Sequence, residues 1–388
     1  MKFIFYTSFN DDPIISRINS LRNKYDENIY DEALALLLQK THTLSLDKNL
    51  FKMYVCYLLA MDENLFSLTA EKNGIEIDAK LYQLALRDMA LILELLKCNV
   101  MEEALGLKNE KHFLDEIYEA VTTHQLKEEL CKYLTSYYKK YGAGEMNRFR
   151  AFKWDKSNGL IGISHCDPIR LDNLIDCDYQ KQALIKNTEN FLMGKVANNA
   201  LLFGDSGTGK SSCVKALLNE YYNEGLRMID LSKADFLYFN KIVAKVRGRG
   251  LKYIIFLDDL SFEEFETEYK YMKALIEGGV EIKPDNVLIY ATSNRRHLIR
   301  ETWNERQGED IHGGDTQQEK LSLADRFGLA LTFTSPNQNA YLKIVFELAK
   351  QYAIDVPENI LREKAIKWEL VHGGRSGRVA KQFINSLM

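Results

Sequence analysis

The stretch Gly204-Asp-Ser-Gly-Thr-Gly-Lys-Ser211 decides the fold, because it matches the pattern G-x-x-x-x-G-K-[ST] of a phosphate-binding loop. It follows an apolar run at residues 201–203 and precedes a segment with helical periodicity at 211–222. Glycines let backbone N–H groups converge on phosphate oxygens, and the start of the next helix adds the positive end of its dipole. The stretch therefore predicts a nucleotide site at a strand-to-helix turn.

Each polar residue of this loop has an expected role. Lys210 is expected to reach the β- and γ-phosphates of ATP, and the hydroxyl of Ser211 is expected to ligate Mg²⁺. A glycine-rich turn with an exposed lysine is the alternative interpretation. The cofactors predicted are thus ATP and Mg²⁺, and the expected nucleotide-binding residues of the loop are Gly204, Asp205, Ser206, Gly207, Thr208, Gly209, Lys210, Ser211 and Ser212.

Short apolar runs alternate with helical segments on both sides of the loop. Such runs are typical of strands buried on both faces of a parallel sheet in a doubly wound α/β domain. We therefore predict an α/β core at residues 170–335 with a parallel five-stranded sheet and flanking helices. The five runs are at residues 200–203, 228–231, 253–257, 287–291 and 329–333.

Polar residues follow two of these runs. Asp258 and Asp259 come directly after the run at 253–257, and Asn294 ends the next one. Ligands of α/β sheets bind at the carboxyl ends of the strands, so Asp258 is expected to hold Mg²⁺ through water. Asp259 is expected to orient or deprotonate the attacking water, and Asn294 to hold that water or touch the γ-phosphate. Solvated strand ends are the alternative.

Three arginines complete the candidate site. Arg326 precedes the last apolar run, where an arginine can stabilise phosphoryl-transfer charge in a neighbouring subunit. In isolation, such an arginine is more often a surface charge. Arg375 and Arg378 lie in a glycine-rich segment of the C-terminal tail and offer two further cations, with a basic helix cap as the alternative.

Outside the core, proline distribution is the clearest organiser. Residues 14–167 contain no proline, and this stretch has helical periodicity, so residues 1–145 are predicted to form an all-α N-terminal domain. Residues 146–169 are predicted to form a β-hairpin and linker around the turn Asn158-Gly159. Residues 336–388 revert to helix and are predicted to form a small helical lid subdomain.

Composition narrows the class of protein. The chain has 388 residues, 46% hydrophobic residues and a net charge of −4, so no overall basic field indicates nucleic acid. None of the six cysteines forms a C-x-x-C pair, which is typical of a reducing compartment. The N-terminus is a poor signal peptide and no long apolar stretch exists. We therefore expect a cytoplasmic protein without membrane contact.

The order of these motifs resembles the AAA+ ATPases and, more narrowly, an uncharacterised bacterial family of AAA+ proteins. The resemblance covers about residues 170–388. It is carried by the stretches at residues 187–192, 204–212, 257–262, 290–298 and 321–328.

The resemblance implies a role for each residue that matches a family motif. Lys210 and Ser211 match the Walker A pair, Asp258 the metal-side acid of Walker B, Asn294 sensor 1 and Arg326 the arginine finger that acts in a neighbouring subunit.

Two assignments stay open between alternatives. Arg378 best matches sensor 2, with Arg375 as its rival. Leu174 and Ile175 fall where the family packs the adenine ring, although apolar residues there are equally consistent with plain core.

Two departures from the family pattern bear on mechanism. The second Walker B acid is Asp259, where most AAA+ proteins have glutamate. Aspartate is one methylene shorter, so slow turnover is expected. The segment at residues 232–250 has no aromatic-hydrophobic-glycine tripeptide, the motif with which AAA+ unfoldases grip a polypeptide. A threading machine is therefore disfavoured.

The leading hypothesis is an ATPase that couples hydrolysis to rearrangement of a homo-oligomeric ring, commonly a hexamer in the family. It would remodel or regulate an unknown protein partner held by the N-terminal helices. One alternative is a switch or scaffold that hydrolyses ATP slowly or not at all. Another, less favoured, is a nucleic-acid loader or remodeller that would use local cations: Lys245, Arg247, Arg249, Lys252, Arg295, Arg296 and Arg300.

Overall fold

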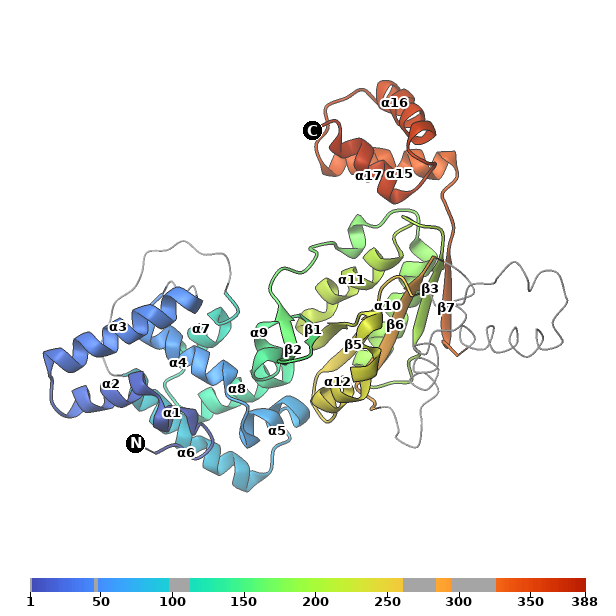
Figure 1. Cartoon of the computed structure of the whole chain (residues 1–388). Helices are drawn as coiled ribbons and strands as arrows, with labels where there is room; N and C mark the ends of the chain where they lie inside the picture. Colours follow the sequence, from blue (N-terminus) through green and yellow to red (C-terminus); the bar gives the residue numbers. More distant parts are fainter. Residues whose placement is uncertain (1, 45–47, 98–111, 261–283, 295–325) are drawn as a thin grey trace. The chain divides into compact units, whose positions relative to one another are not determined.

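The computed structural model describes residues 2–44, 48–97, 112–260, 284–294 and 326–388 (Figure 1). The chain divides into two compact units. The first comprises Met1–Arg150 with two short later segments, Asn223–Gly225 and Gly248–Leu251. The second comprises Ala151–Tyr222, Leu226–Arg247 and Lys252–Met388.

The first unit is built from helices. Their cores come from amphipathic periodicity, as in α8, where Leu130, Leu134, Tyr138 and Tyr141 share a buried face. The helices are α1 (Ser8–Asp11), α2 (Pro13–Asn23), α3 (Glu27–Leu44), α4 (Leu50–Met61), α5 (Leu65–Asn73), α6 (Ala79–Leu96), α7 (Asp115–Thr123), α8 (Lys127–Tyr141) and α9 (Glu145–Arg148).

A buried ion pair fastens the segment Gly248–Leu251 into this helical unit. The guanidinium of Arg249 donates to both carboxylate oxygens of Glu71, at 2.8 and 2.7 Å. Glu71 is fully buried, and it also accepts the backbone N–H groups of Gly250 at 2.9 Å and Ala143 at 3.0 Å. A third nitrogen of Arg249 reaches the exposed Glu63 at 2.7 Å. Arg249 is therefore occupied within the unit and does not belong to a free cationic patch.

The second unit contains one mixed sheet, with strand order β2-β1-β4-β5-β6-β3-β7 among the described residues. The strands from β4 to β7 in this order are parallel neighbours, and they correspond to the five apolar runs of the sequence. The bounds are β1 (Ala151–Asp155), β2 (Gly159–Ile163), β3 (Ala200–Gly204), β4 (Leu226–Asp230), β5 (Lys252–Leu257), β6 (Val287–Ser293) and β7 (Leu329–Phe333).

The hairpin widens this sheet beyond the five strands expected. β1 and β2 form an antiparallel pair around the turn before Gly159, but β1 also pairs in parallel with β4, from Ala151 opposite Met228 to Lys153 opposite Asp230. The hairpin is thus an edge of the sheet and not a separate linker. The strand β4 would otherwise present unpaired backbone groups at an edge, and β1 satisfies them.

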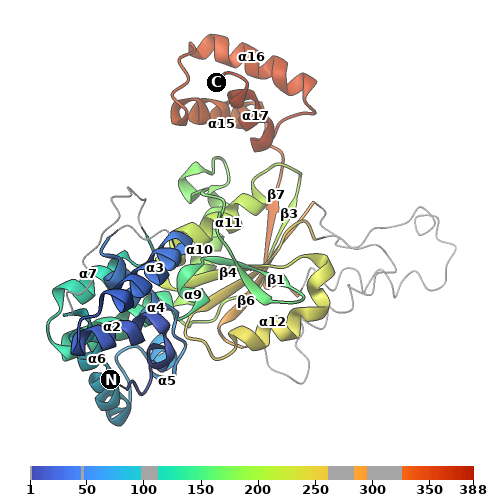
Figure 2. The same cartoon turned by 60° about the vertical axis from the view of Figure 1, so that its left-hand side comes forward.

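Helices α10 (Asp178–Leu192) and α11 (Lys210–Tyr221) pack against one face of the sheet, where Leu184, Phe191, Val214 and Leu217 join a single apolar cluster with strand residues (Figure 2). The same unit also contains α12 (Phe239–Val246) and the 3₁₀ helices η1 (Leu171–Asn173), η2 (Tyr222–Glu224) and η3 (Lys233–Tyr238). This packing fixes the start of α11 at the end of β3, where the phosphate-binding loop lies.

The C-terminal tail folds into three helices: α15 (Gln338–Gln351), α16 (Glu358–Val371) and α17 (Gly377–Asn385). They enclose a small apolar core that includes Tyr341, Val345, Ala365 and Ile384. Ile175, from the loop before α10, packs against this core. No helix of the described residues has the length and apolarity needed to cross a membrane.

The two carboxylates on Arg249 lead to a stability prediction. We expect Glu71→Ala to lower the free energy of unfolding by about 3–5 kcal/mol, because it removes the buried carboxylate that accepts two hydrogen bonds from a largely buried guanidinium and leaves only the exposed Glu63 to pair with it. Glu63→Ala is the matched control: this side chain is 46% exposed, so its loss is expected to cost below about 1 kcal/mol. Urea unfolding of each variant, followed by circular dichroism, measures both. Equal costs would contradict the ranking.

Candidate nucleotide site

The predicted phosphate-binding loop connects β3, which lies between β6 and β7, to the first turn of α11. Its first glycine is required by close packing: a Cβ on Gly204 would lie 1.9 Å from the carbonyl oxygen of Phe333, and the backbone φ is +128°. At Gly209, directly before α11, φ is +97°, in the region that favours glycine. The glycine spacing of the sequence therefore reflects backbone geometry.

Lys210 connects the loop to the neighbouring strand. Its ammonium donates to the carbonyl oxygens of Gly204 at 2.9 Å and Asp205 at 2.6 Å, and to Oδ1 of Asn294 at 3.0 Å. Burial lowers the pKa of Lys210, while the nearby carboxylates of Asp205 and Asp259 oppose that shift. The predicted Walker A lysine and sensor 1 residue thus lie in direct contact.

Oxygen ligands suited to a hard divalent cation meet at the ends of β5 and β6. The Ser211 hydroxyl donates to Oδ1 of Asp258 at 2.5 Å, and the hydroxyl of Thr292 donates to the same oxygen at 2.7 Å. Hydroxyl and carboxylate oxygens are the donors that Mg²⁺ prefers. The residues present therefore fit the metal, with Ser211 and Asp258 as the groups that would hold it.

Thr292 is a further candidate site residue, to which the sequence assigned no role of its own. Besides donating to Asp258, its Oγ1 accepts the backbone N–H of Asp259 at 2.9 Å. It therefore orients both acids from the neighbouring strand. A polar residue at the end of an otherwise apolar run was the only signal that could have indicated it.

The two candidate water-handling residues face each other. Nδ2 of Asn294 donates to Oδ1 of Asp259 at 2.7 Å. Asp259 has a φ of +52°, in the left-handed region that aspartate tolerates better than most residues. The carboxylate of Asp259 is thus held at one oxygen by a side-chain amide, on a strained backbone directly after the strand.

Asp205 positions the loop against the end of β7. Its backbone N–H donates to the carbonyl of Phe333 at 2.9 Å, and its carboxylate accepts the backbone N–H of Ser335 at 2.7 Å. The hydrogen bond from Ser335 lowers the pKa of Asp205, with Lys210 adding to the shift. Thr208 closes the loop by donating to the carbonyl of Asp205 at 2.8 Å.

The geometry separates the two rival arginines of the tail. Arg378 lines the pocket above the loop, and its backbone N–H donates to the carbonyl of Gly207 at 3.2 Å. Arg375 donates to both carboxylate oxygens of Glu369, each at 3.0 Å, and does not line the pocket. Arg378 is therefore the better placed candidate for sensor 2.

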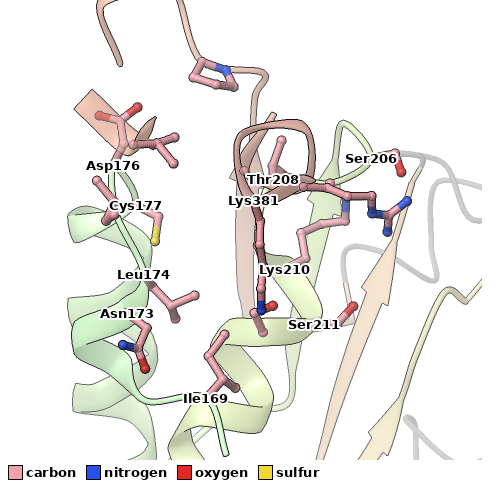
Figure 3. Close-up of a pocket in the computed structure, with 18 of the residues that line it drawn as sticks. Ile169, Asn173, Leu174, Asp176, Cys177, Ser206, Thr208, Lys210, Ser211 and Lys381 are labelled. Carbon is pink, nitrogen blue, oxygen red and sulfur yellow. The ribbon is translucent and has the colours of Figure 1, made fainter. Parts of the chain in front are cut away.

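The loop, the acids after β5, Thr292 and Asn294 at the end of β6, and residues of the tail surround a cavity of about 670 Å³, a volume in the range of small-molecule sites. Figure 3 shows Asn173, Leu174, Asp176 and Cys177 along one wall, opposite the loop and the start of α11. Ile175 lines the cavity and also packs on the tail, so it serves as both pocket wall and core. The tail contributes residues that the sequence did not indicate: Ile344, Leu348, Tyr352 and Lys381.

Other predicted residues lie elsewhere. Arg326 is half-buried shortly before β7 and does not line the cavity of its own chain. Gly204 and Asp205 support the loop from beneath, while Ser206, Gly207, Thr208, Gly209, Ser211 and Ser212 line the cavity. Three of the candidate cations, Arg295, Arg296 and Arg300, lie outside the described residues.

Comparison with known proteins places this geometry in a family. Residues 147–388 match the family model described as "Protein of unknown function (DUF815)". A replication factor C large subunit from Staphylothermus marinus is 36% identical over 70 residues, which cover 18% of this chain and 16% of that protein. The chain thus spans only a small part of that relative.

Solved structures of the RuvB protein of Thermotoga maritima are also similar. A point mutant of that protein aligns with a TM-score of 0.38 and 17% identity over 56% of this chain and 64% of the other. The Holliday junction branch migration motor aligns with a TM-score of 0.34 and 13% identity, over 56% and 72%. Because the family model covers more than half of the chain, the chain belongs to the DUF815 family.

Proposed function

We propose that this protein binds ATP with Mg²⁺ in the cavity above the β3–α11 loop and hydrolyses it. The observation that carries the proposal is that Lys210 and Ser211 of α11, Asp258 after β5 and Arg378 of α17 line one cavity. A phosphate chain seated on the loop would meet backbone N–H groups, the start of α11 and two cations.

The residues suggest a division of labour in hydrolysis. Lys210 would hold the β- and γ-phosphates, and Asp259 would accept a proton from the attacking water while Asn294 orients it. Mg²⁺, when bound, would neutralise charge on the phosphate oxygens. Arg378 would contact the phosphates from the tail, so the helices α15–α17 would respond to the state of the nucleotide.

The position of Arg326 is the reason for proposing an oligomer. Arg326 does not line the cavity of its own chain, so a role in phosphoryl transfer requires that it reach a neighbouring copy. The proposed assembly is a homo-oligomeric ring, with nucleotide at the subunit boundary. We propose that rearrangement of this ring acts on a protein partner held by the N-terminal helical unit.

A second candidate is an ATP-dependent switch that hydrolyses slowly or not at all. The hydrogen bond from Asn294 to Asp259 favours it, because one carboxylate oxygen is already occupied on a short side chain. The positive φ of Asp259 restricts how far that carboxylate can be repositioned.

Nucleic-acid loading is the least supported candidate. Replication factor C large subunit is the name of one relative matched over a short stretch, but two of the candidate cations of this chain have other partners. Arg249 pairs with Glu71, and Lys252 donates to the carbonyl of Asp285 at 3.2 Å with its ammonium 5.0 Å from the ring centre of Phe191.

Binding of ATP is expected to depend on Lys210. Lys210→Ala is expected to abolish measurable ATP binding, because it removes the cation that sits among the loop carbonyls and would face the phosphates. Lys195→Ala, at an exposed lysine of the same unit, is expected to bind as wild type. Isothermal titration calorimetry measures both. Unchanged affinity in Lys210→Ala would contradict the site.

Arg326 is expected to act in the nucleotide site of a neighbouring subunit. Arg326→Ala is expected to bind ATP as wild type but to turn it over up to about 10³-fold more slowly, in the manner of arginine fingers. Mixing it with Lys210→Ala subunits, which keep Arg326, is expected to raise turnover. Arg362→Ala, an exposed arginine of α16, is the control. A steady-state phosphate-release assay decides, and wild-type turnover in Arg326→Ala would remove the assignment.

Hydrolysis of bound ATP is expected to depend on the carboxylate of Asp259. Asp259→Asn is expected to keep ATP binding and to lower the single-turnover rate by about 10²–10⁴-fold, because a general base is lost. Asp285→Asn, an exposed aspartate before β6, is the matched control. Quenched-flow measurement of bound ATP gives both rates. Wild-type protein that still holds intact ATP after many minutes would favour the switch over the ATPase.

A further inference from the structure

Two cysteines from separate elements meet at one wall of the nucleotide cavity. Sγ of Cys177 lies 4.0 Å from Sγ of Cys213, although the residues are 36 positions apart. Cys177 is the residue directly before α10, and Cys213 lies in the first turn of α11. Both are buried, but Cys177 lines the cavity.

Their surroundings make the pair chemically distinct from the other described thiols. Cys56 and Cys131 lie in the helical unit, where burial raises the pKa of each, that of Cys131 to about 12. Cys166 is half-buried, with its thiol near the carbonyl of Ile163. In contrast, the hydrogen bond from Cys213 lowers the pKa of Cys177, and Lys181 adds to the shift.

We propose that Cys177 and Cys213 form an oxidation site, at which hydrogen peroxide closes a disulfide beside the cavity wall formed by residues 173–177. The sulfurs must approach by about 2 Å to reach a disulfide bond length. Cys177 lies outside the regular turns of α10, so its side chain can rotate without disturbing the helix. Peroxide is close to water in size and can reach Cys177 through the cavity.

The chemistry balances in two steps. The thiolate of Cys177 attacks peroxide, forming an S–O bond and breaking the O–O bond, so that sulfur is oxidised and one oxygen leaves as water after protonation. The sulfur of Cys213 then attacks the sulfenic acid, forming the S–S bond while the hydroxyl leaves as water with the thiol proton. Two thiols and one peroxide thus give one disulfide and two waters, and a dithiol reductant reverses the change.

The position of the bond links oxidation to nucleotide. Cys177 follows Ile175 by two residues, and Cys213 follows Ser211 by two, so the disulfide would join the cavity wall to the helix that starts at the phosphates. This link rests on the proposed nucleotide function, whereas formation of the disulfide does not. A nucleotide in the cavity would cover Cys177, and by reciprocity the disulfide would change nucleotide affinity.

The test uses the full-length, nucleotide-free protein treated with hydrogen peroxide. Remaining thiols are alkylated, and a digest without reductant is analysed by mass spectrometry. The expected result is a peptide pair joined through Cys177 and Cys213 that forms before any other disulfide and disappears with dithiothreitol. Alkylated Cys177 and Cys213 in protein whose other cysteines are oxidised would overturn the proposal.

Two variants sharpen this result. Cys213→Ser is expected to leave a sulfenic acid on Cys177 that dimedone captures, because the resolving thiol is missing. Cys166→Ser, at a thiol outside the pair, is expected to form the Cys177–Cys213 disulfide at the wild-type rate. Capture of dimedone at Cys166 but not at Cys177 in the first variant would contradict the order of the steps.

A second arm separates this proposal from the nucleotide function. A non-hydrolysable ATP analogue at about 100 times its Kd is expected to slow disulfide formation by at least about tenfold, because about 1% of the cavities are then open. If the protein forms the disulfide but shows no affinity for ATP or its analogue, the proposed nucleotide function is refuted, whereas the oxidation site is not. Bound analogue without protection would refute the placement of Cys177 at the occupied cavity.

Discussion

The hydrogen bonds donated by the ammonium group of Lys210 hold the candidate site together. The ammonium bonds to two carbonyls at the end of β3 and to Asn294 at the end of β6, so one cation joins the loop to the strand that orients the candidate acids. From Asn294 the contacts continue to Asp259, and Thr292 connects Asp259 to Asp258 and Ser211. A phosphate that attracted the ammonium would therefore alter the environment of each polar group in this chain of contacts.

The sheet makes that arrangement possible. β3 lies between β6 and β7, which brings the carbonyl of Phe333 against Gly204 and the backbone of Ser335 against Asp205. Because the strands are parallel, their carboxyl ends meet at one edge. The tail contacts the loop at this edge through the backbone hydrogen bond from Arg378 to Gly207, so tail residues form one wall of the cavity.

In the helical unit and at the cysteine pair, the partner of a side chain is distant in the sequence and cannot be inferred from its neighbours along the chain. Lys245, Arg247 and Arg249 look like one basic run, yet Arg249 is bound by the buried Glu71, distant in the sequence. Likewise, the cysteines show no motif spacing, yet the sulfur atoms of Cys177, at the cavity wall, and Cys213 lie 4.0 Å apart. In both cases the decisive partner comes from a separate element.

Sequence reasoning alone located the glycine-rich turn between β3 and α11, the five apolar runs that form β3 to β7, and the hairpin turn at Asn158-Gly159. These features depend on local backbone requirements, which a few adjacent residues can encode: glycine at positive φ, apolar runs for buried strands, and a helix start. The folded chain was needed to see that β1 pairs with β4, that Thr292 orients both acids, and that Arg378 rather than Arg375 faces the cavity. Each of those choices depends on which distant group satisfies a hydrogen bond or a charge, and such pairings exist only once the chain has folded.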